Sequence, residues 1–582
     1  MYLRTIQRRN KDGSVVRYVQ LAHNVRHPTS GHAVAQVLHS FGREDQLDRD
    51  GLARLVGSLS RYLDLDLELP AGPTGAADDD GGDGDAGLSF VSSKTLGGCW
   101  ALDGLWRRLG LDELVRTALR GRRCDAVAVE RVLFALVANR ALEAGSKLAA
   151  GRWVERVAHV PGLAALDEDA AYRAMDLLLE VEDTLAEQVF WATATLLDLE
   201  VDLVFFDTSS TYFERDTADD PVARDDRGQP VPGDDQGVGD PVGFRTYGHS
   251  KDSRDDLPQV VIGMAVTRTG IPIRTWCWPG NTADTTVMGQ VRADLRDWKL
   301  TRVVWVTDRG FASATNRRLL QRGGSHYIQA EKLRGSAEGE AALARPGRYR
   351  TVAGNLRIKD VKPGHEQGVM ADRFIVCHNP EQADRDAAVR ERMLALLAEK
   401  IERSDALSKT KRAELRGKIS TMPGLNRYLR VTPAGLLRID TASIKRETHL
   451  DGKWLLRCSD PSLTAQDIAA GYKQLLEVER GWRDMKTHLD LRPVHHRKEE
   501  RIRAHVLLCW LALLLIRIAE NEIPTRSWRR IREELQTLHV GEFTGNAGRA
   551  HQRTELTADQ RDILRALQVP EPPRFLQLTV AD

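Results

Sequence analysis

The stretch VDLVFFDTSSTYFE, residues 201–214, decides the fold that the sequence predicts. Residues 201–206 are mostly apolar, β-branched or aromatic, which is typical of a buried strand. The run ends at Asp207, and a carboxylate there is costly unless it is paired, hydrogen-bonded or holding a metal. Two interpretations follow: Asp207 caps a turn with the hydroxyls after it, or it belongs to a functional site.

A second run of the same kind lies further along the chain. Residues 302–307 (RVVWVT) again have a buried-strand pattern, and Asp308 follows them directly. Two hydrophobic strands that each deliver an aspartate at the same end provide the start of a metal site. Magnesium prefers carboxylate oxygens, and a two-metal site for phosphoryl transfer needs carboxylates from different elements. The pattern therefore predicts a third acid elsewhere.

Length and composition indicate a multidomain globular protein. With 582 residues the chain exceeds a single core, so we expect about three or four domains. The formal net charge is +1, so any basic surface for nucleic acid must be local. The six cysteines form no CxxC pair, which argues against a disulfide framework or a cysteine zinc site and fits a reducing cytoplasm.

The sequence predicts neither a signal peptide nor a membrane span. The amino terminus, MYLRTIQRRN, lacks the apolar core of a signal peptide. The most apolar run, residues 506–516, is too short to span a bilayer and is typical of a buried helix. We therefore expect a cytoplasmic protein without membrane contact.

The first 90 residues predict a small module followed by a linker. Residues 1–69 contain a hairpin over 2–27, in which KDGS is the turn, and a helix over 52–63. Residues 70–90 are rich in Gly and Asp and cannot bury enough surface to order themselves, so they predict a flexible linker.

Residues 91–199 have helical periodicity and predict a helical DNA-binding region. The basic cluster at Arg120, Arg122 and Arg123 fits two interpretations, a solvated helix end or a contact with the DNA backbone.

Residues 200–332 predict strand, strand, strand, helix, strand, helix, strand. The predicted ranges are 201–206, 260–266, 271–278, a helix capped by Asn281, 302–307, 314–322 and 326–333. Capping also explains Asp284, which follows Asn281 by three residues. Acids end the first and fourth strands. This order is typical of a ribonuclease-H-like arrangement, an α/β core with helices beside a mixed sheet.

The pattern then changes twice. Residues 333–465 predict a β-rich insertion subdomain, with strands at 356–361, 373–378, 436–440 and 453–459 and a charged helix at 387–419. Helical periodicity returns in residues 466–525, which we expect to complete the core and to carry the third acid. Residues 526–582 form a C-terminal tail region.

The third acid is sought in residues 468–505, a densely charged stretch. On a single helix, three- and four-residue steps place one set of side chains on a common face. These are Tyr472, Leu475, Glu479, Trp482, Arg483 and Lys486. Glu479 is then either part of a surface salt bridge or a metal ligand beside phosphate-binding cations, and Glu477 points to a different face.

Several motifs in order resemble the insertion-sequence DDE transposases of bacteria that carry a Tyr-Arg-Glu-Lys signature. The motifs are FFDTSS, YGHSKDSRDDLPQ, TDRGF and RPVHHRKEERIRAH, spread over residues 139–515. Tyr472, Glu479 and Lys486 fall in register with the signature, whereas Leu475 occupies the arginine position. Arg480 or Arg483 is a candidate to supply the missing charge.

The resemblance implies a metal-dependent DNA strand transferase. Asp207, Asp308 and Glu479 would be the catalytic residues and would hold two Mg²⁺ ions, for which Mn²⁺ would substitute. The implied reaction is cleavage at the element's ends followed by attack on target DNA. The implied partners are double-stranded DNA, both ends and target, and a second copy of the chain in a synaptic homodimer near the nucleoid.

The resemblance also implies DNA contacts. Tyr472, Lys486, Arg483 and Arg480 would bind phosphates near the cut. Arg245, His249, Lys251 and Arg254 either line the DNA path or belong to an ordinary polar loop.

Two other site hypotheses are disfavoured. No cysteine or spaced histidine completes a zinc site with His495 and His496, so these fit the DNA side better. No base accompanies Ser209 and Ser210 as nucleophiles.

Two alternatives to the transposase remain: a ribonuclease-H-like nuclease that does not join strands, and an inactive derivative that only binds DNA. The large insertion argues against the first, and the presence of all three acids argues against the second.

Overall fold

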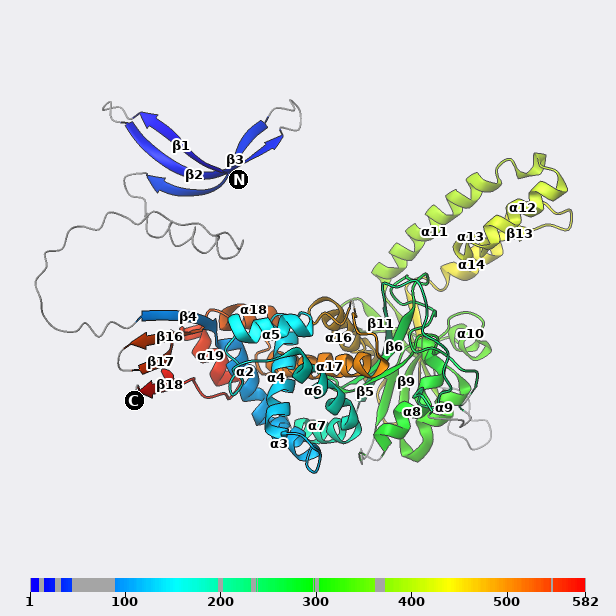
Figure 1. Ribbon diagram of the computed structural model, residues 1–582. Coiled ribbons are helices and arrows are strands. Elements are labelled where there is room, and N and C mark those ends of the chain that lie inside the picture. Colours follow the sequence, from blue (N-terminus) through cyan, green and yellow to red (C-terminus); the bar gives the residue numbers. More distant parts are fainter. Residues whose placement is uncertain are drawn as a thin grey trace, which may run out of the picture. The chain divides into compact units, whose positions relative to one another are not determined.

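The computed structural model describes residues 2–9, 15–26, 33–43, 89–196, 203–231, 237, 239–296, 298, 303–361, 372–492, 494–545 and 548–580. The chain divides into two units, Met1–Asp85 and Ala86–Asp582 (Figure 1). The first unit contains an antiparallel sheet of β1 (Tyr2–Arg9), β2 (Val15–Arg26) and β3 (Ala33–Arg43). The predicted hairpin is present, and β3 was not predicted. The KDGS turn and the helix expected at 52–63 lie outside the described residues.

Six helices form the predicted helical region. They are α2 (Gly97–Arg108), α3 (Leu111–Ala118), α4 (Ala126–Leu142), α5 (Lys147–Arg156), α6 (Glu168–Glu180) and α7 (Glu182–Leu196). Helix α4 starts where the Asp125 side chain accepts the backbone N–H groups of Val127 and Ala128, a regular N-cap. Every residue of α4 from Glu130 onward is buried, so this helix is the centre of the region.

A nine-stranded mixed sheet forms the α/β part of the second unit. Its order is β10-β11-β12-β15-β9-β8-β5-β6-β7. The strands are β5 (Leu203–Tyr212), β6 (Gln259–Val266), β7 (Pro272–Pro279), β8 (Val304–Thr307), β9 (His326–Glu331), β10 (Arg350–Ala353), β11 (Leu356–Val361), β12 (Arg373–His378) and β15 (Lys453–Cys458). The pairs β5–β8 and β8–β9 are parallel, and the others are antiparallel.

The elements between 203 and 331 occur in the predicted order. Helix α8 (Asp284–Arg296) follows β7, the short 3₁₀ turn η2 (Arg309–Phe311) and α9 (Ala314–Gln321) follow β8, and η3 (Arg322–Gly324) leads to β9. The predicted end of the first strand was wrong. The strand β5 runs beyond Asp207 to Tyr212, because these residues pair with β6 in unbroken register. Asp207 therefore lies within a strand and does not cap a turn.

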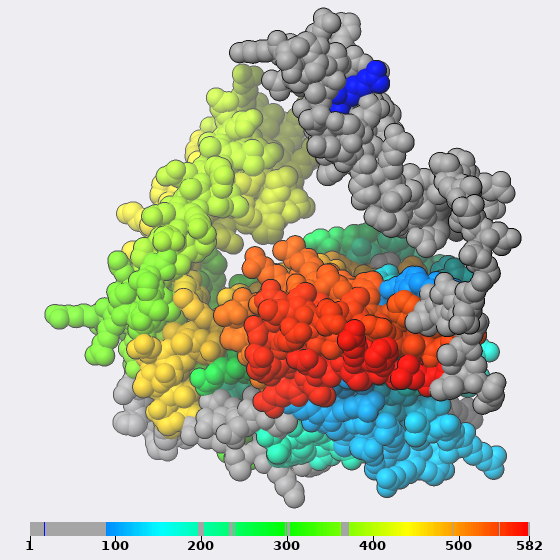
Figure 2. Space-filling model, turned by 90° about the vertical axis from the view of Figure 1, so that its left-hand side faces the viewer, coloured from blue at the N-terminus to red at the C-terminus, as the bar shows by residue number. Residues whose placement is uncertain are grey.

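The segment expected as a separate insertion contributes to the same sheet. Its strands β10, β11, β12 and β15 extend the sheet beyond β9. A helical arm with its own small core lies between β12 and β15 and projects from the sheet (Figures 1 and 2). The arm holds α11 (Pro380–Ile401), α12 (Lys409–Ser420), α13 (Pro423–Asn426), α14 (Thr441–Thr448) and the pair β13 (Leu429–Val431) and β14 (Leu437–Ile439). The predicted charged helix is two helices, α11 and α12.

The chain then returns to the sheet through α15 (Ala465–Lys473), α16 (Leu476–Thr487) and α17 (Glu499–Glu522). Helix α17 packs against α4, α6 and β7. Within the described residues it is the one helix long and apolar enough to span a membrane, and its apolar window is wholly buried inside the protein.

The last residues form a second sheet rather than a simple tail. Its order is β18-β17-β16-β4, with β4 (Ser89–Thr95), β16 (His539–Gly545), β17 (Gly548–Arg553) and β18 (Phe575–Val580). Helices α18 (Trp528–Leu535) and α19 (Ala558–Ala566) accompany it. Strand β4 begins at Ser89, so the end of the expected linker is part of this sheet.

Candidate active site

The strand register brings Asp207 and Asp308 together. Phe206 of β5 is the partner of Thr307 in the parallel strand β8, and one aspartate follows each of these residues. Neighbouring strands lie about 4.8 Å apart. The two carboxylates therefore occupy equivalent positions on adjacent strands, as predicted.

The alternation of side chains along β5 decides which face Asp207 occupies. Phe206 packs against Trp276 and Phe311, on the face where α8 covers the sheet. Asp207 points to the opposite face, where α15 and α16 lie, because successive side chains alternate. The aspartate is thereby turned towards the segment in which the third acid was expected.

Tyr472, near the end of α15, contacts this site directly. Its hydroxyl donates a hydrogen bond to Asp308 Oδ1 at 2.9 Å. Burial, reinforced by the Asp308 carboxylate, raises the pKa of the Tyr472 phenol well above its usual range. The tyrosine therefore remains protonated and acts as a fixed donor to the aspartate.

Glu479 belongs to α16 and lines the same cavity as the two aspartates. This cavity has a volume of about 940 Å³, and Asp207, Asp308, Tyr472 and Glu479 all contribute to its wall. Glu479 itself is exposed. The single helix predicted across this stretch was wrong, because α15 ends at Lys473 and α16 begins at Leu476.

The break between the helices is small. Leu475 N–H donates to the Tyr472 carbonyl at 3.1 Å and Glu477 N–H to the Gln474 carbonyl at 2.9 Å, so the chain continues in tight turns. Tyr472 and Glu479 still face one cavity for this reason. Leu475, which stands at the arginine position of the signature, lines the cavity with them.

The electrostatics around Asp207 favour a cation. Burial raises the pKa of Asp207 to about 6 against the opposing charge of Lys251, and the Asp284 and Asp308 carboxylates add to the rise. Lys251 Nζ lies 3.9 Å from Asp207 Oδ1 and 3.1 Å from Asp284 Oδ2. It also donates to the Thr208 carbonyl at 2.8 Å. The lysine thus offsets part of a carboxylate repulsion.

Asp284 has a different place from the one predicted. It is the first residue of α8, three residues after Asn281, so Asn281 does not cap this helix. The Thr208 hydroxyl donates to Asp284 Oδ1 at 2.5 Å, on the α8 face of β5. Asp284 therefore belongs to the network that holds Lys251 beside Asp207.

A divalent cation fits the donor set of this cavity. Asp207, Asp308 and Glu479 offer only carboxylate oxygens, which suit a hard ion. Burial raises the pKa of Asp207, the Asp284 and Asp308 carboxylates add to the rise, and a bound cation would relieve their repulsion. As placed, however, no three His, Cys, Asp or Glu side chains in the described ranges are gathered closely enough to hold an ion together.

The predicted phosphate-binding residues of α16 differ in their surroundings. Lys486 Nζ pairs with Asp252 Oδ1 at 2.9 Å, and Arg492 holds the other oxygen of this carboxylate at 2.7 Å. Arg480 pairs with Glu520 at 2.7 Å, and it therefore points to α17 rather than into the cavity. Arg483 is exposed.

The four loop residues separate into two groups. Arg245 is buried, and its guanidinium pairs with Asp219 at 2.6 Å, so it stabilises the loop instead of lining an open path. Arg254 pairs with Asp256 at 2.8 Å and lies over the Tyr212 ring. His249 is exposed. Lys251 alone of the four contacts the aspartates.

Basic residues that the sequence did not single out surround the cavity. They are Arg309, Lys332, Arg334, Lys453 and Lys473. Two had a local signal, because Arg309 follows Asp308 and Lys473 follows Tyr472. Lys332 and Lys453 come from strand ends that only the assembled sheet brings to the cavity.

The remaining candidates have other roles. Ser209 and Ser210 are buried in β5, and the Ser210 hydroxyl accepts the Lys251 backbone N–H at 2.9 Å, so neither is presented as a nucleophile. In the basic cluster, the exposed Arg122 pairs with Glu180 of α6.

Two family models match the sequence. One is described as the transposase DDE domain and matches residues 228–515, which include Asp308 and Glu479 and begin after Asp207. The other is described as the N-terminal domain of the IS1634 family transposases and matches residues 3–68. The chain is therefore a DDE transposase, an enzyme that acts on DNA with a divalent metal. The N-terminal match gives the particular kind, a transposase of an insertion sequence.

A comparison with solved structures adds little to this. One match is the cryo-EM structure of the piggyBac transposase synaptic complex with hairpin DNA, at 10% sequence identity and a TM-score of 0.34. It covers 75% of this chain and 78% of that chain. A likeness of this size establishes neither fold nor function. No curated protein matches the sequence.

Proposed function

We propose that Asp207, Asp308 and Glu479 are the catalytic carboxylates and that they hold two Mg²⁺ ions, which Mn²⁺ can replace. The observation that carries this proposal is the shared cavity: acids from β5, from the end of β8 and from α16 line one wall. Carboxylates that come from separate elements are the arrangement that a two-metal phosphoryl transfer requires.

The core has a ribonuclease-H-like arrangement in this proposal. Three consecutive strands, β5, β6 and β7, pair antiparallel, and β8 and β9 join β5 in parallel. Helices α8 and α9 intervene between these strands, and the third acid comes from a later helix. That order supports the assignment.

The protein's residues position the reacting groups. Bound metal would activate the attacking water or 3′-hydroxyl and stabilise the leaving oxygen. Tyr472 fixes the orientation of Asp308 through its hydrogen bond. Lys251 fixes the neighbourhood of Asp207 through Thr208 and Asp284. Cleavage at the element end comes first, and the freed 3′-hydroxyl then attacks target DNA.

The DNA backbone binds along the basic rim of the cavity. Arg309, Lys332 and Lys473 contact phosphates there, a role that fixes register without reading sequence. Arg309 or Lys473 then supplies the positive charge that is missing at Leu475. Among the predicted contacts, Arg483, His249 and Arg254 extend this path, whereas Lys486 positions the loop of Lys251 through Asp252.

The partners and the location follow from the reaction. Two element ends must be held together, so the active form is a homodimer on double-stranded DNA. Residues 1–69 and 91–199 supply end recognition, and the enzyme works at the nucleoid in the cytoplasm.

Two adjacent glutamates of α16 provide a matched test. Glu479→Gln and Asp207→Asn should each reduce Mg²⁺-dependent cleavage of an end-containing duplex at least about 1,000-fold, because several kcal/mol of transition-state stabilisation are lost. Glu477→Gln removes an acid that pairs with Arg480 at 3.7 Å and should leave cleavage within about threefold of wild type. DNA binding by gel shift should persist in all three. Full cleavage by Glu479→Gln would remove this residue from the site.

A further inference from the structure

A second cavity, separate from the carboxylate site, lies where α4, α5, α6 and α17 meet the segment that follows α16. Its volume is about 170 Å³. The lining side chains used below are Arg140, Lys147, Tyr172, His495, His496 and His505. Cations and imidazoles dominate this wall, although it lies between packed helices.

Lys147, the first residue of α5, is buried with only 4% of its surface exposed. Its Nζ lies 3.0 Å from His505 Nδ1. Burial, together with the charge of Arg140, lowers the pKa of Lys147 to about 7. An imidazole nitrogen therefore stands where a buried lysine usually has a carboxylate.

Arg140 is equally buried, at 4% exposure. Its Nη1 donates to the carbonyl oxygens of Leu489 at 3.2 Å and Asp490 at 3.4 Å. Across the described ranges, no carboxylate lies within ion-pair distance of Arg140 or Lys147. Asp490, the acid on the cavity wall, has an exposed side chain.

The positive charges of Lys147 and Arg140 also act on the imidazoles of His496 and His505. The ring of His496 lies between those of Tyr172 and His505, at 6.0 and 5.5 Å between centroids. Burial, together with the charges of Lys147 and Arg140, lowers the pKa of His496 to about 3 and that of His505 well below its ordinary value. The buried groups therefore suppress one another's charge.

We propose that this cavity binds a phosphate group. Arg140 offers a planar fork of donors, and Lys147 and His496 bring further N–H groups from two other elements. An anion would supply the negative partner that Arg140 and Lys147 do not have within ion-pair distance among the described residues. Its size admits a tetrahedral oxyanion, and Gly145 and Ser146, directly before α5, complete the lining. The inference does not depend on the proposed roles of the three acids.

The phosphate has two possible sources, a phosphodiester of bound DNA or free orthophosphate. The first test uses the full chain without DNA and follows its melting temperature as orthophosphate replaces chloride at constant ionic strength. Phosphate should stabilise the wild type by mass action. Lys147→Met and Arg140→Gln should weaken this binding at least tenfold.

Lys359→Met is the matched control. Lys359 is also a buried lysine, at 6% exposure, and it donates to the Arg345 carbonyl at 2.8 Å, away from the cavity. This variant should respond to phosphate like the wild type. An equal response in all four proteins would overturn the proposal, since phosphate would then act elsewhere.

The second test separates the two sources. DNA affinity is measured against salt concentration, and loss of one phosphate contact reduces the slope of log K by about 0.9. A smaller slope in Lys147→Met but not in Lys359→Met assigns the cavity to DNA. An unchanged slope together with phosphate stabilisation assigns it to free orthophosphate. No effect in either test refutes the site, and Lys147→Met then only removes a buried charge.

Discussion

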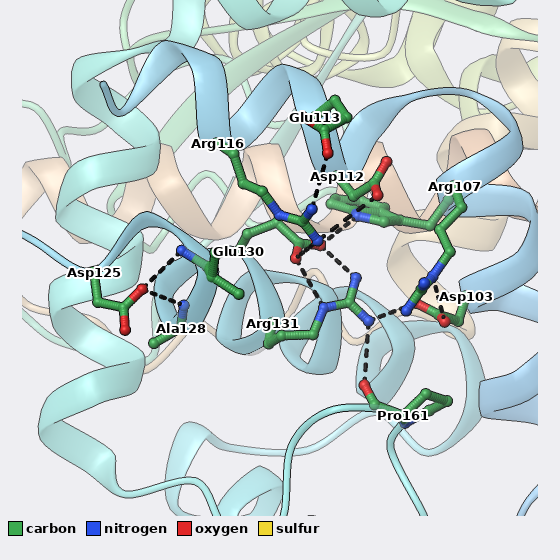
Figure 3. Close-up of polar contacts among 12 residues, drawn as sticks. Asp103, Arg107, Asp112, Glu113, Arg116, Asp125, Ala128, Glu130, Arg131 and Pro161 are labelled. Atoms are coloured by element: carbon green, nitrogen blue, oxygen red, sulfur yellow. Dashed lines mark hydrogen bonds and ion pairs between the residues drawn. The ribbon is translucent and has the colours of Figure 1, made fainter. Parts of the chain in front are cut away.

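The two ends of helix α4 treat a buried arginine in opposite ways. Arg131 and Arg140 are each 4% exposed. Arg131 donates to Glu130 at 2.8 Å, to Asp103 at 2.6 Å and to the Pro161 carbonyl at 3.2 Å (Figure 3). Within the part of the chain that the structure describes, Arg140 donates to the carbonyl oxygens of Leu489 and Asp490 and pairs with no carboxylate. Neighbouring carboxylates therefore neutralise the guanidinium of Arg131, whereas the described contacts of Arg140 are with carbonyl oxygens.

At the Arg131 end of α4, cations and carboxylates pair with one another. Glu130 is fully buried, and it also accepts a hydrogen bond from Arg116 at 3.0 Å (Figure 3). The indole N–H of Trp106 donates to the same carboxylate at 2.8 Å. Burial alone would raise the pKa of Glu130, but the contacts of Arg131, Arg116 and Trp106 outweigh it, so the pKa lies below its ordinary value. The cations and carboxylates of this cluster neutralise one another. At the other end, no carboxylate of the described residues lies within ion-pair distance of Arg140, and in the carboxylate cavity Asp207, Asp308 and Glu479 line one space. Both places are candidates for a ligand.

The largest effect on stability is expected at the Arg131 end of α4. Arg131→Gln should lower the free energy of unfolding by about 3–5 kcal/mol, because it leaves Glu130 and Asp103 without their shared buried partner. The loss should appear in urea unfolding followed by tryptophan fluorescence, with catalysis per folded molecule unchanged.

Arg107 provides the control within the same network. It also pairs with Asp103, at 2.9 Å, but 54% of its side chain is exposed. Arg107→Gln should therefore cost less than about 1 kcal/mol. Similar losses for the two variants would mean that burial does not decide the strength of this network.

The pairing of acids in the core could be predicted, because it depends on local signals. A buried run followed by an acid marked Asp207 and Asp308, and the alternation of strands and helices implied parallel neighbours. The end of β5 could not be predicted in this way. Thr208, Ser209 and Ser210 have a turn-like composition, but pairing with β6 keeps them extended.

Contacts between distant segments were beyond the sequence. Lys251 was singled out as a loop cation, but its position beside Asp207 depends on Thr208 and Asp284 from two other elements. The wall of the proposed phosphate cavity comes from α4, α5, α6 and α17, so the periodicity of a single segment cannot predict it. The helix break after Lys473 also had no signal in the sequence. The residues at the break, Gln474 and Leu475, are neither glycine nor proline.

The next largest effect is expected on cleavage, in the carboxylate cavity. Tyr472→Phe removes the hydroxyl that holds Asp308 at 2.9 Å and keeps the ring. Cleavage should fall about 10–100-fold, the usual cost of losing a group that orients a metal ligand. Stability should hardly change. An effect on melting temperature that fully accounts for the lost activity would show that Tyr472 is only a packing residue.

A smaller effect separates the two ends of α4 by pH. The pKa of Lys147 is lowered to about 7 in the folded chain, whereas an unfolded lysine keeps its ordinary pKa of 10.5. Between these values the unfolded state binds one more proton, so Lys147 makes stability rise with pH, by at most about 1.4 kcal/mol per unit. Below pH 7 its contribution is flat. The charged or titratable groups around it are Arg140, Tyr172, Asp490, His495, His496, Arg501, His505 and Cys509.

The check is a difference between proteins in phosphate-free buffer. From pH 7 to 9 the wild type should gain stability relative to Lys147→Met, while wild type and Arg131→Gln should run parallel. Parallel curves for wild type and Lys147→Met would mean that the lysine stays charged in the fold.

The smallest effect is expected for Arg140→Gln, and it completes the comparison with Arg131→Gln on the same helix. The change gives up two hydrogen bonds to carbonyl oxygens, each worth about 1 kcal/mol, but it also removes a buried charge that has no acid beside it. These contributions oppose each other, so the free energy of unfolding in phosphate-free buffer should change by less than about 1 kcal/mol. A loss as large as that of Arg131→Gln would mean that an acid neutralises Arg140 in solution, and the cavity would then have no charge to offer an anion.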